Sequence, residues 1–514
     1  MSKDTTEKDR KVLHSLGYAQ ELSRSMGGFS NFAISFSIIC ILAGGISSFP
    51  AAFNSTGGGG AFVGWFVGGL FAMLVSLSMG QIASSYPTAG GLYHWGSILG
   101  GKFWGWLTAW FNLLGLVFVV SSVDVYLYLV FFKGILLESV LAYDTTAFTI
   151  WHQHAFVAAA LITQALLNHY GIALTTKLTD LSGYLIFALT IVFIGALFIF
   201  SPVEQLDFTR LFTFSNYTGD AGGAVIPTAT PNLLLAFFFG LIYVMYTITG
   251  FDASGHTSEE THDAQVNVPR GMWTSVFYSW VFGLVMVAAF ILTMPSIEEG
   301  AKQGFNSFFY VWGASGMPYF LKLLLAIGFV FVNYICALAG LTSTSRMMYA
   351  FARDGGLPGS QFLSQVSTET RTPTYAIWTA IVLAFISTLY ADAFLILATG
   401  CAVFLYISYI IPVFAGLLAE GNTWKEKGPF DLGVWSKPIA ILSTIGVAIL
   451  TTTGFFPPNQ RVFYLTVALL IVLPIAWFAG INKTFEGVPT GAKIQERQKL
   501  IAEIESRFDD NPAN

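Results

Sequence analysis

Charged side chains are scarce in this sequence. Only 10% of its 514 residues are charged, whereas 54% are hydrophobic. An ordinary soluble domain carries roughly 25% charged residues, so the composition excludes a typical soluble protein. The formal net charge is -5 and no basic patch is concentrated in the chain, so we expect no nucleic-acid partner.

Cysteines and catalytic motifs are also sparse. The three cysteines, Cys40, Cys336 and Cys401, all lie in apolar runs, which predicts neither a disulfide framework nor a metal cluster. No HExxH or GxSxG motif occurs, and the acidic residues inside apolar runs are isolated. We therefore expect no enzyme activity and no cofactor.

Long apolar runs are abundant. Runs of about 18 residues or more can each cross a hydrocarbon core of about 30 Å as a helix. Twelve such runs predict an all-α polytopic membrane protein embedded in a lipid bilayer. They lie at 29–50, 61–83, 104–130, 152–172, 181–200, 231–253, 273–294, 320–345, 374–391, 393–417, 437–456 and 462–481.

The distribution of lysine and arginine orients these spans. Residues 1–28 are polar and lack the short apolar core of a signal peptide, so we expect a cytoplasmic tail with an amphipathic helix. With that start inside, nineteen of the 24 basic residues fall on the cytoplasmic side. The outer side holds Lys133, Arg210, Lys302, Lys322 and Arg461. The bias predicts that both termini lie inside.

Two of the predicted spans are interrupted. The sixth breaks at "TGFD", residues 249–252, and the first has a weak point at "AGGISS", residues 43–48. A membrane helix loses backbone hydrogen bonds only where protein or a water-filled cavity replaces them. Breaks in two helices five spans apart are typical of an inverted-repeat transporter with its site at the midplane.

A break also exposes backbone groups that can bind a ligand. Free amides around Gly44–Ser47 would suit a carboxylate, and free carbonyls near Thr249 and Gly250 would suit an ammonium group. The alternative is that these glycines only let helices pack closely. Asp252 either belongs to the site or lies just past the bilayer as a helix cap.

Four stretches then resemble one transporter family. They are "LHSLGYAQELSRSMGGFSNFAISFSII" (13–39), "SSYPTAGGLYHWGSILG" (84–100), "STSRMMYAFARDGGLP" (343–358) and "RTPTYA" (371–376). In this order they resemble the amino acid-polyamine-organocation (APC) permeases, in particular the amino acid/choline branch with its GABA, choline and bidirectional amino acid permeases. The likeness extends over nearly the whole chain.

The resemblance implies the leucine-transporter fold, with a 5+5 inverted repeat, broken helices 1 and 6, and two additional C-terminal helices. The organisation that follows is a tail at 1–28, a first repeat at 29–200, a second repeat at 231–417, two spans at 437–481 and a cytoplasmic tail at 482–514. The last tail contains a short amphipathic helix, which is either solvated or docked.

The resemblance also implies substrate-binding residues. They are Ala43, Gly44, Gly45 and Ile46 for a carboxylate, and Tyr246, Thr249 and Gly250 for an amine. An aromatic side chain commonly covers the substrate, and Tyr246 or Phe251 occupies that position. Ordinary aromatic packing is the alternative.

Charged residues near the span ends suggest further roles. Arg346, Arg353 and Asp354 would pair with opposite charges as a cytoplasmic gate closes, or would serve as ordinary cytoplasmic anchors. Asp124 is expected near the outer end of the third span, as a vestibule group that attracts cationic substrates or as an interfacial residue. We expect His94, His256 and His262 to be surface residues.

The coupling ion is predicted to be sodium or a proton. "ALAGLTSTSR" (337–346) resembles the sodium-site segment of transporters with this fold, which implies Ala339, Thr342 and Ser343 with carbonyls of Ile41 and Gly44. Hydroxyls bonded to their own helix are the alternative. Proton-coupled members of the superfamily often carry a lysine where this chain has Ile186, which favours sodium.

Together these features predict a secondary permease for amino acids or related amines such as GABA, located in the cell membrane. The alternatives are a choline or polyamine permease, an amino acid exchanger or exporter, and a nutrient sensor that does not transport. The oligomeric state is not predicted.

Overall fold

The computed structural model describes residues 3–389, 393–456 and 459–508. These residues form helices joined by loops, and the β-type pairing among them is limited to two isolated bridges, Met26 with Thr261 and Glu420 with Trp424. The predicted all-α architecture is confirmed. The predicted span 374–391 and the tail 482–514 both end outside the described residues.

Eight helical segments of the described residues are long and apolar enough to cross a membrane. They are Gly28–Ser85, Lys102–Val140, Ile172–Ile199, Ala264–Thr293, Tyr319–Arg353, Ile396–Ala419, Gly433–Thr453 and Gln460–Thr484. Their α-helical parts are α2 (Gly28–Ile39), α3 (Ile46–Ser85), α5 (Lys102–Tyr126), α7 (Ile172–Ile199), α10 (Ala264–Thr293), α13 (Tyr319–Arg353), α16 (Ala393–Ala419), α17 (Ser436–Thr453) and α18 (Gln460–Ala476). The π-helical parts are η1 (Ile41–Gly45), η2 (Leu127–Val140) and η8 (Trp477–Ile481).

Three further apolar helices are shorter or less hydrophobic: α6 (Ile150–His169), α8 (Leu233–Thr247) and α15 (Thr374–Ser387). The remaining helices lie in the connections and tails. They are α1 (Lys3–Ser15), α4 (Leu92–Gly100), α9 (Ala253–His256), α11 (Ile297–Lys302), α12 (Ser307–Ala314), α14 (Ser360–Leu363), α19 (Asn482–Thr484) and α20 (Ala492–Ser506), with short turns η3 (Phe208–Leu211), η4 (Gly219–Gly222), η5 (Ser258–Glu260), η6 (Gly304–Asn306) and η7 (Gly433–Trp435).

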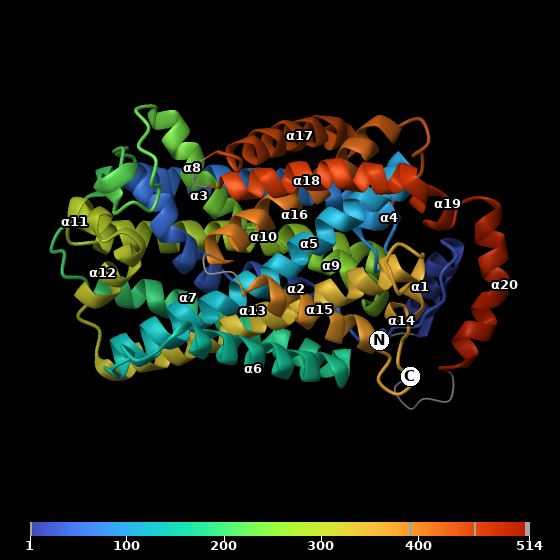
Figure 1. The fold of residues 1–514 in the computed structure, drawn as a ribbon, viewed down its shortest axis with the longest axis horizontal. Coiled ribbons are helices and arrows are strands. Elements are labelled where there is room, and N and C mark those ends of the chain that lie inside the picture. The colour runs from blue at the N-terminus through green and yellow to red at the C-terminus, as the bar shows by residue number, and fades with distance from the viewer. Residues whose placement is uncertain (1–2, 390–392, 457–458, 509–514) are drawn as a thin grey trace.

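Most of the long apolar helices lie roughly parallel to the long axis of the molecule, whereas α20 runs across it at one end, where it meets α1 (Figure 1). Inside the bundle α3 packs against α10 and α8, and α5 packs against α16 and α13. In its most apolar window, Gly28–Ser85 is 94% buried, whereas Gln460–Thr484 is 22% buried. The first segment therefore lies inside the bundle, and the last lies at its surface.

The predicted spans 29–50 and 61–83 lie in the same helical segment, Gly28–Ser85. This segment is kinked at Thr56 and Gly57, whose backbone leaves helical geometry. Gly57 adopts a φ of 76°, which an L side chain rarely tolerates. The chain therefore turns within helical structure, without a separate loop.

The first predicted break is present but lies earlier than the glycines suggest. Helix α2 ends at Ile39, and Cys40 has a φ of 29° before η1 begins at Ile41. The amides of Ala43 and Gly44 both donate to the Cys40 carbonyl at 2.8 Å. The expectation of a free Gly44 amide is wrong, because the helix that follows the break already begins at Ile41.

The second break lies where the sequence predicts it. Helix α8 ends at Thr247, and α9 begins at Ala253. Gly250 has a φ of 83°, and a Cβ atom there would lie 2.2 Å from Ile38 Cγ2. Glycine is required here because the backbone is left-handed and because α2 passes directly beside it.

Candidate functional site

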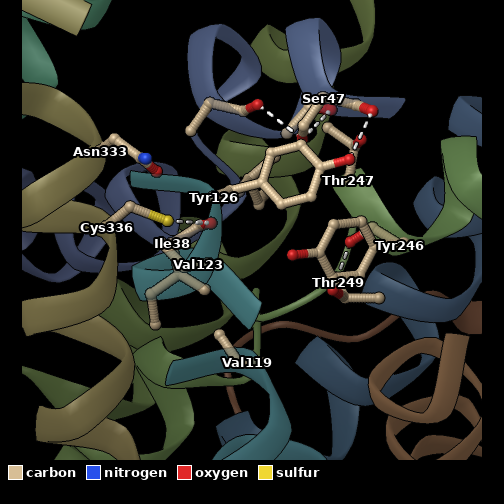
Figure 2. A pocket seen from close by; sticks show the side chains of 13 residues that line it. Ile38, Ser47, Val119, Val123, Tyr126, Tyr246, Thr247, Thr249, Asn333 and Cys336 are labelled. Atoms are coloured by element: carbon tan, nitrogen blue, oxygen red, sulfur yellow. Dashed lines mark hydrogen bonds between the residues drawn. The ribbon is translucent and has the colours of Figure 1, made fainter. Parts of the chain in front are cut away.

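A cavity lies where the two broken helices meet α5 and α13 (Figure 2). The space between its atoms, about 370 Å³, is partly open solvent. Its lining residues are Ile38, Ile39, Ala43, Gly44, Ser47, Val119, Val123, Tyr126, Tyr246, Thr247, Thr249, Asn333 and Cys336. The cavity thus brings together both interruptions that the sequence shows.

Four of the predicted substrate residues line this cavity: Ala43, Gly44, Tyr246 and Thr249. The other four, Gly45, Ile46, Gly250 and Phe251, are not among its lining residues. A Cβ atom on Gly45 would lie 2.6 Å from Met286 Cε, so Gly45 serves close helix packing. Phe251 is buried against Tyr409, with ring centroids 4.9 Å apart.

The two broken helices also contact each other directly. A Cβ atom on Gly44 would lie 2.7 Å from Thr247 Cγ2, so the absence of a side chain lets α8 approach η1. Ser48 and Thr247 share a hydrogen bond of 2.8 Å between their hydroxyls. The geometry of the first break therefore depends on that of the second.

Tyrosines of α16 replace hydrogen bonds lost at the second break. Tyr406 donates its hydroxyl to the Ile248 carbonyl at 2.8 Å, and the Gly250 amide donates to the Tyr409 hydroxyl at 3.0 Å. Thr249 donates to the Tyr246 carbonyl at 2.7 Å. The interruption is therefore stabilised by protein groups, as a broken membrane helix requires.

Asp252 is the centre of a buried polar network at this break. Its carboxylate accepts hydrogen bonds from Tyr409 at 2.8 Å, Asn112 at 3.0 Å and His256 at 3.2 Å. It precedes α9 without capping that helix through its side chain. Asp252 therefore joins α5, α9 and α16 while it occupies the N-cap position of α9.

The chain after the break does not return to water. His256, Glu259, Glu260 and Thr261 are all fully buried. His94 is fully buried as well, stacked on Tyr18 with ring centroids 5.0 Å apart. The expectation that His94 and His256 are surface residues is wrong, because Tyr18 stacks on His94 and because His256 contacts the Asp252 carboxylate and the Ala89 carbonyl. His262 is half-buried.

Asp124 lies buried between α5 and α6. One carboxylate oxygen accepts a hydrogen bond of 2.9 Å from Gln164 Nε2, and the other oxygen has no partner. The side chain is fully buried, so in this conformation Asp124 does not line an open vestibule. No salt bridge to Asp124 forms within the described residues.

The predicted ion-site hydroxyls differ in their surroundings. The Thr342 hydroxyl lies 2.8 Å from Asn168 Oδ1 and 2.9 Å from the Leu338 carbonyl. It has one hydrogen, which it donates either to α6 or to its own helix. Ser343 is buried, and its hydroxyl has no hydrogen-bond partner in the part of the chain that the structure describes. Ser343 follows Cys336 by two turns on the same face of α13, and Cys336 contacts the Ile38 carbonyl at 3.1 Å. Ser343 therefore lies on the face toward α2.

The arginines expected at the cytoplasmic gate pair with the two glutamates that follow the second break. Arg346 binds Glu260 at 2.9 Å, and Arg353 binds Glu259 at 3.0 Å. Burial raises the pKa of Glu260 despite Arg346. Burial also opposes ionisation of Glu259, but Arg353 and the Ala89 amide bring its pKa below the ordinary value.

Asp354 joins three segments at the same end. It accepts a hydrogen bond of 2.8 Å from Tyr18 and binds Arg497 of α20 at 2.8 Å. Burial alone would raise the pKa of Asp354, but His94 and Arg497 lower it to about 2. The three residues predicted for the gate thus take part in buried ion pairs that close this end of the bundle.

Several lining residues are missing from the prediction, above all Asn333. Ser47, Tyr126 and Cys336 also line the cavity, and Tyr126 donates to the Ser47 carbonyl at 3.4 Å. The available signal was a lone amide in the apolar run "FVFVNYICALAG" (329–340).

Comparison with known proteins identifies the family of this chain. The model of the family described as "Amino acid permease" matches residues 26–479. The chain belongs to the amino acid permease family. The resemblance to permeases of the APC superfamily is thereby confirmed.

The sequences of individual relatives align with this chain over most of their length. Amino-acid permease BAT1 of Arabidopsis thaliana is 32% identical over 87% of this chain and 88% of its own. The BAT1 homolog of Oryza sativa subsp. japonica is 30% identical, over 92% and 94%. The GABA-specific permease of Saccharomyces cerevisiae is 28% identical, over 88% and 79%.

Family membership and the apolar helices establish the class of this protein. It is an integral, multi-pass membrane protein and an amino acid transporter whose substrates are small molecules. It is not an enzyme, as the sequence indicates.

Proposed function

We propose that this permease is a secondary active transporter that carries amino acids or related small amines such as GABA by alternating access. The observation that supports this most strongly is the cavity between the two breaks, lined by Ala43 and Gly44 on one side and by Tyr246 and Thr249 on the other. The names of its relatives, amino-acid permease and GABA-specific permease, agree with this class of substrate.

The proposed topology has twelve spans in a 5+5 inverted repeat followed by two C-terminal helices. It divides Gly28–Ser85 into two spans at the kink at Thr56 and Gly57, and it counts α6, α8 and α15 as spans despite their modest length or apolarity. The breaks at Cys40 and Gly250 then fall in spans 1 and 6. These positions are the ones that such a repeat requires.

In the proposed binding mode the substrate carboxylate faces the start of the outer half-helix. The first amides of η1, at Ile41 and Leu42, begin that half-helix and carry its partial positive charge. The amine faces the end of α8, where the helix leaves its last carbonyls without intrahelical partners. Tyr246 and Thr249 line that side of the cavity.

The coupling ion in this proposal is sodium or a proton, and the two ions depend on different residues. A sodium ion would be held by oxygens of Ile41, Gly44, Ala339, Thr342 and Ser343. The unpartnered Ser343 hydroxyl supports this assignment, whereas the engaged Thr342 hydroxyl does not. A proton would bind at Asp124, a buried carboxyl group without a cationic partner.

Uptake into proteoliposomes tests the proposal. Labelled GABA and a mixed amino acid pool are supplied under an imposed sodium gradient and, separately, under an imposed pH gradient. We expect accumulation under one gradient alone. Sodium coupling requires that Ser343→Ala abolish the sodium dependence, and proton coupling requires that Asp124→Asn abolish the pH dependence.

Other outcomes would replace parts of the proposal. Flux that needs no gradient but requires a trans substrate would indicate an exchanger or exporter. Choline or polyamine flux without amino acid flux would change the substrate class. Binding without flux would indicate a nutrient sensor. Detection at the cell membrane tests the proposed location.

A further inference from the structure

Asn333 is an unpaired amide within the wall of the cavity. It lies on α13, only 1% of its surface is exposed, and among the described residues neither its Oδ1 nor its Nδ2 has a hydrogen-bond partner. Figure 2 shows it opposite Tyr246 and Thr249, beside Cys336. Buried amides are ordinarily hydrogen-bonded, and one inside an apolar span is costly, so an unpaired Asn333 needs a partner from the cavity.

The cavity also has apolar lining residues. They are Ile38 and Ile39 at the end of α2, and Val119 and Val123 of α5. The two breaks face the carboxylate and amine of a substrate in the proposed binding mode. The wall with Asn333 therefore faces the remaining part of an amino acid, which is its side chain.

The amide group selects one class of side chain. It offers both a donor and an acceptor, which a hydroxyl or another amide can match. A carboxylate only accepts and an ammonium only donates, so each would leave one atom of Asn333 unpaired. An apolar side chain would leave both atoms unpaired, and sites built around such hydrogen bonds discriminate strongly against analogues that lack them.

We infer that Asn333 determines substrate specificity and that the cavity takes α-amino acids whose side chain has a short aliphatic stem and an uncharged polar tip. The inference rests on the proposed function and narrows it. Threonine, asparagine and glutamine fit this description. Valine, leucine and glutamate, which resemble them in shape, do not, and GABA lacks the group that Asn333 would bind.

The test measures ligand affinity with the purified full-length chain in lipid nanodiscs. The shift of the unfolding temperature is recorded against the concentration of each amino acid and converted to a Kd. The probes are the near-isosteric pairs threonine and valine, asparagine and leucine, and glutamine and glutamate, together with GABA. We expect the uncharged polar member of each pair to bind at least about tenfold more tightly.

Variants assign that preference to Asn333. Asn333→Leu should reduce the ratio within the threonine–valine and asparagine–leucine pairs to below about twofold, because the polar partner is removed. Asn333→Asp keeps the size but removes the donor, and it should also lose the preference. Tyr334→Phe is the matched control: this neighbour bonds Thr163 on the exposed side of α13, and the variant should keep the wild-type ratios.

The outcomes separate this inference from the proposed function. Equal affinities within each pair for the wild-type chain would overturn the inference while leaving an amino acid site intact. Unchanged ratios in a folded Asn333→Leu or Asn333→Asp variant would overturn it as well. Absence of binding by every amino acid and by GABA would overturn both.

Discussion

Arg346 and Glu260 form a bidentate ion pair that is fully buried between α13 and η5. Arg346 Nη2 lies 2.9 Å from Glu260 Oε1, and Nε lies 3.1 Å from Oε2. Neither side chain is exposed. The pair joins the inner end of α13 to the chain just after the second break, so rearrangement at the break and opening of this end are physically connected.

Removing one member of this pair should destabilise the protein. Glu260→Gln leaves the Arg346 charge buried without its counter-ion, which costs about 3–5 kcal/mol. The exposed pair Lys302 and Glu299 provides the control, because Glu299→Gln should change stability by less than about 1 kcal/mol. Thermal unfolding of the two variants in the same detergent measures both changes in stability. Equal losses of stability would contradict this prediction.

The contact between the two tails should depend on Glu505. This residue of α20 accepts hydrogen bonds from Arg10 at 2.9 Å, from His14 at 2.7 Å and from the Gln20 amide at 2.8 Å. Burial alone would raise its pKa, but these donors hold the pKa of Glu505 below its ordinary value. Glu505→Gln should therefore weaken the docking of α20 on the N-terminal segment.

The lowered pKa fixes the direction of the pH dependence. The stabilisation is fully present above the ordinary carboxyl pKa of about 4.3 and is lost as the pH falls through the lower, folded-state value. Spin labels at the exposed positions Lys11 and Lys499 report the separation of α1 and α20. We expect an unchanged distance between pH 8 and pH 6 and a broadened one only in more acidic buffer, where folding is checked in parallel. Separation near neutral pH would contradict this.

Gly250→Ala tests whether the second break needs a glycine. The substitution forces an alanine into a φ of 83° and places its Cβ 2.2 Å from Ile38 Cγ2. The backbone strain alone costs about 1–2 kcal/mol, and transport should fall because α2 or the break must shift. Gly195→Ala is the matched control, since nothing lies within 4 Å of that position. Uptake at the wild-type rate by the Gly250→Ala variant would show that the second break does not need a glycine.

Asp252→Asn tests the polar network at the same break. The new amide would turn a donor toward Asn112, His256 or Tyr409, so at least one of three hydrogen bonds to the carboxylate is lost. We expect a larger relative decrease in the transport rate than in the thermal stability, because the network joins the moving break to α5 and α16. Asp180→Asn, which affects a single bond from Ser30, should have a smaller effect on uptake. Comparable decreases in uptake for Asp252→Asn and Asp180→Asn would argue against a role of the network in transport.

The sequence predicted the features that depend on local chemistry. Apolar runs located the helices, and the glycine at 250 located the second break because only that residue tolerates its backbone geometry. The first break was misplaced because Gly44 marks close packing against Thr247, whereas the turn itself falls on Cys40, a residue with no local signature of a break.

Features that depend on distant contacts were not predictable in the same way. Glu505 meets Arg10 only because both tails fold onto one end of the bundle. His94 is buried because Tyr18 covers it. Asn333 could be recognised as a polar group in an apolar span, but its missing partners became evident only once the surrounding helices were in place.

The central claim is that the cavity between the two breaks binds and translocates amino acids. Counterflow tests it most directly, because exchange of labelled for unlabelled substrate requires no ion gradient, and with sodium and protons at equal concentrations on both sides it does not depend on the ion assignment. Proteoliposomes loaded with an unlabelled amino acid pool should accumulate the labelled pool transiently, and Gly250→Ala should reduce this accumulation while Gly195→Ala does not. Absence of counterflow with every amino acid and with GABA, in protein shown to be folded, would contradict the account.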